Sequence, residues 1–247
     1  METAARCNIG ACRLVNQDCI FSSDQPVGIL PNLFIVADGM GGHAAGERAS
    51  SETVDYCVKF VQNAWPTDTG ELFYQMAEGA NAYVHNLALA NPELAGMGTT
   101  LVAASICEDA VYCINVGDSR MYVLNQEDQF VRITMDHSVV EMMLRRGELT
   151  EKEARVHPNR NYITRAIGTE DTVIADLYKV PAGYARMVML CSDGLSGQIE
   201  DERISEILKM RSQTLSERVD MLVNEANRNG GTDNISIIVV DLERMDT

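Results

Sequence analysis

Four aspartates stand beside apolar runs of the kind that form buried strands. Three follow such a run and one precedes it: Asp38 after LFIVA, Asp118 after YCINVG, Asp193 after MVMLCS, and Asp233 before NISIIVV. Because strand ends converge at one edge of a sheet, we expect these carboxylates to meet. Grouped carboxylates repel one another and lose hydration, and hard divalent cations relieve both costs. The spacing therefore predicts a divalent metal site.

Each aspartate also has a simpler interpretation as a turn residue. Asp38 and Asp193 are each followed by glycine, a common turn dipeptide, and Asp118 lies in a Gly-Asp-Ser sequence that suits a turn between strands. The combination favours chemistry over turns. Gly39, Gly41 and Gly42 permit close backbone approach beside Asp38, and a carbonyl in such a loop is itself a metal ligand.

The elements that must position these residues change in period along the chain. Strand-type runs are predicted at 33–37, 99–106, 110–116, 120–124, 130–134, 173–180, 186–191 and 235–241. Helical patterns are predicted at about 44–63, 72–91, 138–146, 150–156, 201–210 and 215–228. Hairpin-spaced strands interrupted by helix pairs indicate antiparallel sheets with helices outside them, an α+β class. Since no linker or repeat marks a boundary, we expect one domain, 1–247.

The bulk composition limits the partners. A formal charge of -16 and a pI near 4.6 disfavour nucleic acid and anionic membrane. Seven cysteines form no C-x-x-C pair, as expected of reduced thiols in a cytoplasmic protein. The first residues contain no apolar signal region and no run approaches 18 apolar residues, so neither secretion nor membrane spanning is expected.

Seven short motifs occur in a fixed order between Arg13 and about Val240. They are RLVNQD (13–18), VADGMGGH (36–43), GTT (98–100), VGDSR (116–120), DHS (136–138), CSDGL (191–195) and GTDN (231–234). In this order the sequence resembles the metal-dependent protein phosphatase 2C family in its compact bacterial form. The resemblance implies a central antiparallel β-sandwich flanked by pairs of helices on both faces, a four-layer α-β-β-α arrangement. It also implies hydrolysis of phosphoserine and phosphothreonine in proteins.

The same resemblance implies a set of metal ligands. Asp38 would bridge two Mn²⁺ or Mg²⁺ ions, and the Gly39 carbonyl would bind one of them. Asp18, Asp193 and Asp233 would bind the other, directly or through water. Asp118 would help Asp193 to hold a third, weaker ion. Paired ions lower the pKa of a bridging water and clamp phosphoryl oxygens for in-line attack.

Two further residues are implied to contact the substrate. Arg13 matches the phosphate-binding arginine, whose planar guanidinium grips two oxygens, although in isolation it is an ordinary surface arginine. His43 lies where it would protonate the departing serine or threonine oxygen, and its simpler interpretation is a histidine at a helix start. Gln17 replaces a glutamate common in relatives, so we expect altered metal affinity.

The segment 138–167 corresponds to the family's flap, which influences substrate choice. It carries five arginines in an acidic protein, a pattern that suits either a phosphoprotein-binding patch or a solvated helix face: Arg145, Arg146, Arg155, Arg160 and Arg165. We expect phosphorylated protein substrates, a cognate serine/threonine kinase and a monomer.

Two other functions compete with the phosphatase. Residues 39–44 fit the G-x-G-x-x-A fingerprint of dinucleotide-binding oxidoreductases, but Asp38 stands where a pyrophosphate would bind, and no second parallel strand follows. A catalytically inactive phosphoprotein-binding relative would normally lack some metal carboxylates, whereas Asp18, Asp38, Asp193 and Asp233 are all present.

Overall fold

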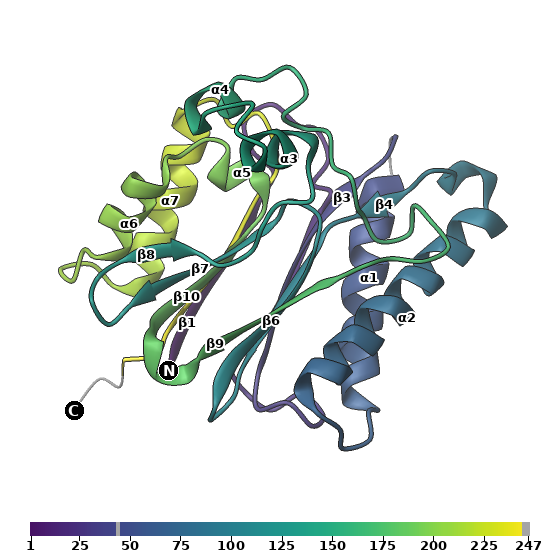
Figure 1. Ribbon diagram of the computed structural model, residues 1–247, viewed down its shortest axis with the longest axis horizontal. Coiled ribbons are helices and arrows are strands. Elements are labelled where there is room, and N and C mark those ends of the chain that lie inside the picture. The colour runs from purple at the N-terminus through teal and green to yellow at the C-terminus, as the bar shows by residue number, and fades with distance from the viewer. Residues whose placement is uncertain (43–44, 244–247) are drawn as a thin grey trace.

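The computed structural model describes residues 1–42 and 45–243, and its strands form two antiparallel sheets stacked face to face (Figure 1). Helices pack against the outer side of each sheet, so the order of layers is helix, sheet, sheet, helix. This confirms the α+β class and the sandwich expected from the sequence.

The first sheet has the strand order β1-β11-β10-β7-β8, with every pair antiparallel. Its strands are β1 (Glu2–Asn8), β7 (Arg120–Asn125), β8 (Phe130–Arg132), β10 (Ala185–Cys191) and β11 (Ile235–Asp241). Strand β11 therefore lies between the first strand and β10, although it is the last strand in the described chain. Helices α6 (Asp201–Leu208) and α7 (Leu215–Arg228) cover this sheet.

The second sheet has the strand order β2-β3-β5-β6-β9, and the short β4 pairs with the end of β3. Its strands are β2 (Asp18–Ser23), β3 (Leu33–Met40), β4 (Gly98–Thr99), β5 (Leu101–Ile106), β6 (Ala110–Val116) and β9 (Asp176–Pro181). Helices α1 (Ala45–Gln62) and α2 (Thr69–Ala90) pack on its outer face. Asp68 caps α2 by accepting hydrogen bonds from the Gly70 and Glu71 amides.

The space between the sheets is filled by apolar side chains that alternate along the strands. Phe34, Val188 and Ile238 are fully buried there and come from three different strands. Alternation is what a strand with both faces covered requires, because successive side chains point to opposite sides. The sandwich therefore provides rigid strand ends on which a site can be built.

The predicted flap leaves the first sheet after β8 and contains two short helices, α3 (Val139–Arg145) and α4 (Glu151–Arg155). Figure 1 shows both at one end of the sandwich, beside the one-turn helix α5 (Asp193–Ser196). Thr150 and Glu153 form a reciprocal capping box at the start of α4, as the sequence pattern predicts. The sequence did not predict β1, β2 or α5.

Candidate metal centre and cleft

Strand pairing brings the first two carboxylates together. Asp18 is the first residue of β2, and it lies directly opposite Asp38 of β3 in the antiparallel register. The Asp38 backbone is held from the other side, where its N–H donates to the Thr100 hydroxyl (2.9 Å) and its carbonyl accepts from the Thr100 N–H (2.8 Å). Like charges directly opposite are destabilising in a sheet, so this arrangement needs compensation.

Three more carboxylates reach the same region from other elements. Asp193 opens α5 after β10, Asp233 lies two residues before β11, and Asp118 lies in the turn between β6 and β7. Gly117 makes that turn possible with a φ of 106°, and its N–H donates to His137 Nδ1 (3.1 Å). Asp118, Asp193 and Asp233 line one cleft of about 450 Å³ between the flap and α5.

The carboxylates perturb one another strongly. Burial raises the pKa of Asp38 well above its ordinary value, and the charges of Asp18, Asp193, Asp118 and Asp233 raise it further. Burial likewise raises the pKa of Asp18 to about 7, against hydrogen bonds from serine side chains that lower it. These carboxyls are enclosed by protein, yet Asp38 and Asp193 keep part of their surface exposed. The cluster therefore carries more negative charge than its surroundings stabilise.

The pKa values of Asp118 and Asp193 are raised for the same reason. Burial is the largest cause for both, and the Asp193 charge adds to it at Asp118. The nearby Arg120 guanidinium acts in the opposite direction on both pKa values. Arg120 is therefore a positive charge that partly compensates this side of the cluster.

Two carboxylate oxygens show what the cluster lacks. Asp18 Oδ1 and Asp193 Oδ1 are buried without a hydrogen-bond partner, a costly state for a charged acceptor. Hard cations bind such oxygens, so the donor set fits Mn²⁺ or Mg²⁺. Within residues 1–42 and 45–243, however, no three His, Cys, Asp or Glu side chains already stand close enough to enclose an ion.

The remaining predicted residues take different positions. Arg13 donates to Asp233 Oδ2 (2.8 Å) and to the Thr232 carbonyl (3.2 Å), so the guanidinium lies at the cluster. Gly39 packs so tightly that a Cβ there would collide with the Gly46 carbonyl, and its N–H donates to the Gln17 carbonyl (3.0 Å). His43 lies outside the described residues.

Sequence reasoning gave no role to two residues that organise the cluster. Ser192 Oγ donates to Asp18 Oδ2 (2.8 Å) and joins β10 to β2. Asn234 accepts from the Gln17 N–H (2.8 Å) and donates to the carbonyls of Ile9 (2.8 Å) and Val15 (3.1 Å). Both lie in the CSDGL and GTDN motifs, so their position beside ligand aspartates was the available signal.

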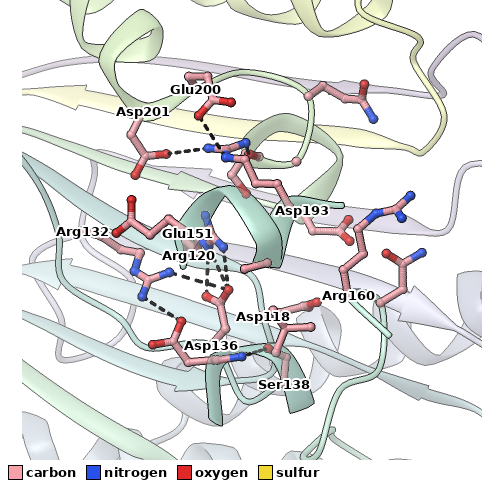
Figure 2. A pocket seen from close by; sticks show the side chains of 18 of the residues that line it. Asp118, Arg120, Arg132, Asp136, Ser138, Glu151, Arg160, Asp193, Glu200 and Asp201 are labelled. Atoms are coloured by element: carbon pink, nitrogen blue, oxygen red, sulfur yellow. Dashed lines mark hydrogen bonds and ion pairs between the residues drawn. The ribbon is translucent and has the colours of Figure 1, made fainter. Parts of the chain in front are cut away.

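The flap arginines are mostly paired. Arg155 binds Glu200 (2.9 Å) and Arg165 binds Asp176 (3.0 Å), while Arg146 lies 3.9 Å from Glu148. Figure 2 shows Arg160 on the cleft side, near Asp193. The flap therefore presents less net positive charge than its arginine content suggests.

An antiparallel sandwich that gathers five carboxylates beside a polar cleft defines the class of a metal-dependent hydrolase. Known proteins narrow the class. A protein phosphatase 2C family profile matches residues 12–227. The chain is 39% identical over 221 residues to the serine/threonine phosphatase stp of Listeria innocua, covering 86% of this chain and 85% of that protein.

Solved structures agree with the sequence match. Serine/threonine phosphatase Stp1 from Staphylococcus aureus superposes with a TM-score of 0.90 at 32% identity, covering 98% of this chain and 95% of that one. The catalytic domain of serine threonine protein phosphatase PstP, solved in complex with two manganese ions, gives a TM-score of 0.82 at 30% identity and 97% coverage of both chains. The chain belongs to the protein phosphatase 2C family. The expected enzyme class, a serine/threonine phosphatase, is confirmed.

The dinucleotide-binding alternative is not supported. Strand β3, which precedes the glycine fingerprint, pairs antiparallel with both β2 and β5, whereas that fingerprint requires a parallel βαβ unit. In the part of the chain that the structure describes, none of the helices combines the length and apolar character needed to cross a bilayer.

Proposed function

We propose that this phosphatase hydrolyses phosphoserine and phosphothreonine in proteins, with water as the nucleophile at a two-metal centre built on Asp38. The observation that carries the proposal is the cluster itself: five carboxylates reach one end of the sandwich, and two of their oxygens are buried without partners. Such a cluster destabilises the fold unless cations bind to it.

The proposed ligands are Asp18, Asp38, Asp193 and Asp233, together with the Gly39 carbonyl. When bound, Mn²⁺ or Mg²⁺ ions lower the pKa of water and neutralise phosphoryl charge. Asp118 is the proposed partner of Asp193 for a weaker third ion. The Arg120 guanidinium lowers the pKa of both carboxylates, so Asp118 and Asp193 share one side of the cluster, as this subsite requires.

The proposed roles of Arg13 and His43 follow from the motifs that contain them, and the role of Arg13 also follows from its position. Arg13 grips two phosphate oxygens, and it must first leave Asp233, its partner at 2.8 Å. Such an exchange would leave Asp233 free to hold a metal ion and the guanidinium free to bind the substrate phosphate. His43 donates a proton to the departing serine or threonine oxygen.

Phosphopeptide hydrolysis tests the proposal. We expect phosphate release from phosphothreonine and phosphoserine peptides only with Mn²⁺ or Mg²⁺ present, and loss of release with chelator. Asp38→Asn is expected to abolish release, while the control Asp24→Asn, an exposed carboxylate on the loop after β2, is expected to retain it. Release that persists in chelator, or an inactive wild type that still binds phosphopeptides, would overturn the proposal; the latter result indicates a binding protein.

The wider proposal is a monomeric cytoplasmic enzyme that opposes a serine/threonine kinase, with residues 1–247 forming one catalytic domain and 138–167 its flap. All seven cysteines are free thiols, which suits a reducing compartment. Light scattering during gel filtration tests the monomer, and accumulation of phosphoproteins after gene deletion tests the opposition to a kinase.

A further inference from the structure

A chain of alternating charges runs from the metal cluster to the flap. Its members are Arg120 at the start of β7, Asp136 in the segment after β8, Arg132 at the end of β8, and Glu141 in the first turn of flap helix α3. We call these four residues the ion-pair chain. Figure 2 shows Arg120, Arg132 and Asp136 together along one wall of the cleft, next to Asp118.

The contacts within the ion-pair chain are close but unequal. Arg120 grips Asp136 with two nitrogens, at 2.6 Å from Nη2 to Oδ2 and 2.9 Å from Nε to Oδ1. Arg132 binds Glu141 Oε2 at 2.8 Å but lies 3.8 Å from Asp136 Oδ2. The same Asp136 oxygen is therefore shared between two arginines, and Arg120 holds it more tightly.

The ion-pair chain is shielded from water at its acidic members. The side chains of Asp136 and Glu141 are 8% and 9% exposed, whereas exposed pairs elsewhere on the flap, such as Arg146 and Glu148, are 68% and 48% exposed. Solvent screens an interaction between shielded charges much less than one between exposed charges. A charge change at one end of the ion-pair chain is therefore felt at the other.

We propose that Arg132 and Glu141 are positioning residues that, through Asp136 and Arg120, couple cation binding at the carboxylate cluster to the hold on flap helix α3. This inference rests on the proposed two-metal function. Without cations, Arg120 is shared between Asp136 and the charges of Asp118 and Asp193. Cations at the cluster repel Arg120 and strengthen its bond to Asp136. Asp136 then attracts Arg132 less, and Arg132 binds Glu141 more firmly.

Through this coupling, helix α3 responds to cation binding although it does not contact the cations. The α3 helix is anchored at its start, where Ser138 Oγ accepts from the Glu141 N–H (3.1 Å), so a tighter Arg132–Glu141 pair fixes the whole first turn. Thermodynamic reciprocity requires that a fixed flap also favours cation binding. Helix α3 is thus held more firmly when the centre is loaded.

Hydrogen–deuterium exchange with and without Mn²⁺ tests the inference. In wild type we expect Mn²⁺ to slow exchange of α3 amides by about fivefold, the lower end of typical coupling. Glu141→Gln and Arg132→Gln should remove this slowing while Mn²⁺ still binds by calorimetry. Arg132→Lys, which keeps the positive charge but lacks the planar guanidinium, should retain part of the slowing. The control Glu148→Gln, in an exposed flap pair, should behave as wild type.

The outcomes separate this inference from the proposed function. If wild type binds Mn²⁺ and hydrolyses phosphopeptide but α3 exchange does not change, or if Glu141→Gln keeps the full change, the coupling is wrong and the phosphatase stands. If wild type neither binds Mn²⁺ nor hydrolyses phosphopeptide, the proposed function itself fails. Exchange in α7, which covers the first sheet, reports whether each variant is folded. If a glutamine variant does not fold, Arg132→Lys still tests the coupling.

Discussion

The carboxylate cluster and the flap face each other across one cleft, but different forces hold them. The cluster stands on strand ends whose neighbours Phe34, Val188 and Ile238 are fully buried between the sheets. The flap helices α3 and α4 bury only Val140, Glu141 and Ala154, and ion pairs and helix caps hold them.

The difference separates two tasks. Apolar packing fixes carboxylates that would otherwise move apart, because the packed strands cannot yield to their repulsion. Polar contacts leave the flap able to open locally at low cost, since segments with few buried apolar contacts have low local stability. The two sides of one cleft therefore differ in rigidity.

The largest effect is expected from the cluster itself. Asp38→Asn should lower phosphopeptide hydrolysis by about 10³-fold, since metal-ion catalysis contributes several kcal/mol to transition-state stabilisation. The same change should raise the stability of the metal-free protein, because the raised pKa of Asp38 shows that its charge opposes folding. Initial rates and chelator-treated thermal unfolding measure the two effects. A variant that loses both activity and metal-free stability contradicts this account.

Phe34→Ala tests the apolar packing between the two sheets. Removing this fully buried ring should lower the free energy of unfolding by about 3–5 kcal/mol, through lost transfer energy and a cavity between the sheets. Denaturant unfolding measures the change. Tyr162→Ala is the matched flap control, because its ring is 63% exposed, and we expect no resolved change in global stability. If both substitutions lower the free energy of unfolding equally, the sandwich and the flap do not differ in how they are held.

The charge of the cluster is tested by pH. Raised pKa values mean that the folded protein keeps protons which the unfolded chain releases above about pH 4. The stability that these retained protons contribute to the folded state is therefore fully present below that pH. It is lost as pH rises through about 7, the pKa of Asp18. Burial lowers the pKa of His137, and this shift makes stability increase with pH. The four carboxyls with raised pKa values outweigh this single group.

Urea unfolding with chelator should accordingly give a lower free energy of unfolding at about pH 8 than at about pH 5. Saturating Mn²⁺ should remove or reverse this decline, because metal binds the ionised carboxylates. Metal-free stability that increases over this range would show that the cluster does not oppose folding.

The smallest effects compare two identical helix caps. Thr214 in α7 and Thr150 in α4 each form a capping box with a glutamate three residues later. Thr214→Ala should lower global stability by about 1 kcal/mol, because α7 is part of the packed sandwich. Thr150→Ala should instead increase exchange and proteolysis within the flap, with global stability unchanged. If Thr150→Ala lowers the unfolding midpoint as much as Thr214→Ala, the flap unfolds with the sandwich.

Periodicity predicted the packed elements most accurately. The limits expected for Ala110–Val116, Leu215–Arg228 and Ile235–Asp241 match the structure. The strands β1 and β2 were missed because ETAARCN and DCIFSS lack an apolar alternation strong enough to indicate a strand. Tertiary pairing makes these segments strands, β1 against β11 and β2 against β3.

The candidate site was predictable in its residue types but not in its contacts. Four aspartates at strand ends indicated a cluster, and the family resemblance added Asp18; all five lie at one end of the sandwich. The Arg13–Asp233 pair and the Ser192–Asp18 bond join residues 220 and 174 positions apart, so only the folded chain reveals them. The ion-pair chain was hidden for the same reason: Arg120 and Asp136 lie in separate motifs, and Arg132 and Glu141 resemble ordinary surface charges in sequence.

The central place of β11 has a consequence for biosynthesis. Strands β2 and β3 are neighbours in sequence, so Asp18 and Asp38 meet as soon as this hairpin forms. Asp233 arrives only with β11, which must insert between β1 and β10. Local pairing therefore brings together two of the four proposed aspartate ligands in a nascent polypeptide, although an isolated hairpin is only marginally stable. The proposed centre is completed only after the residues of β11 have been synthesised.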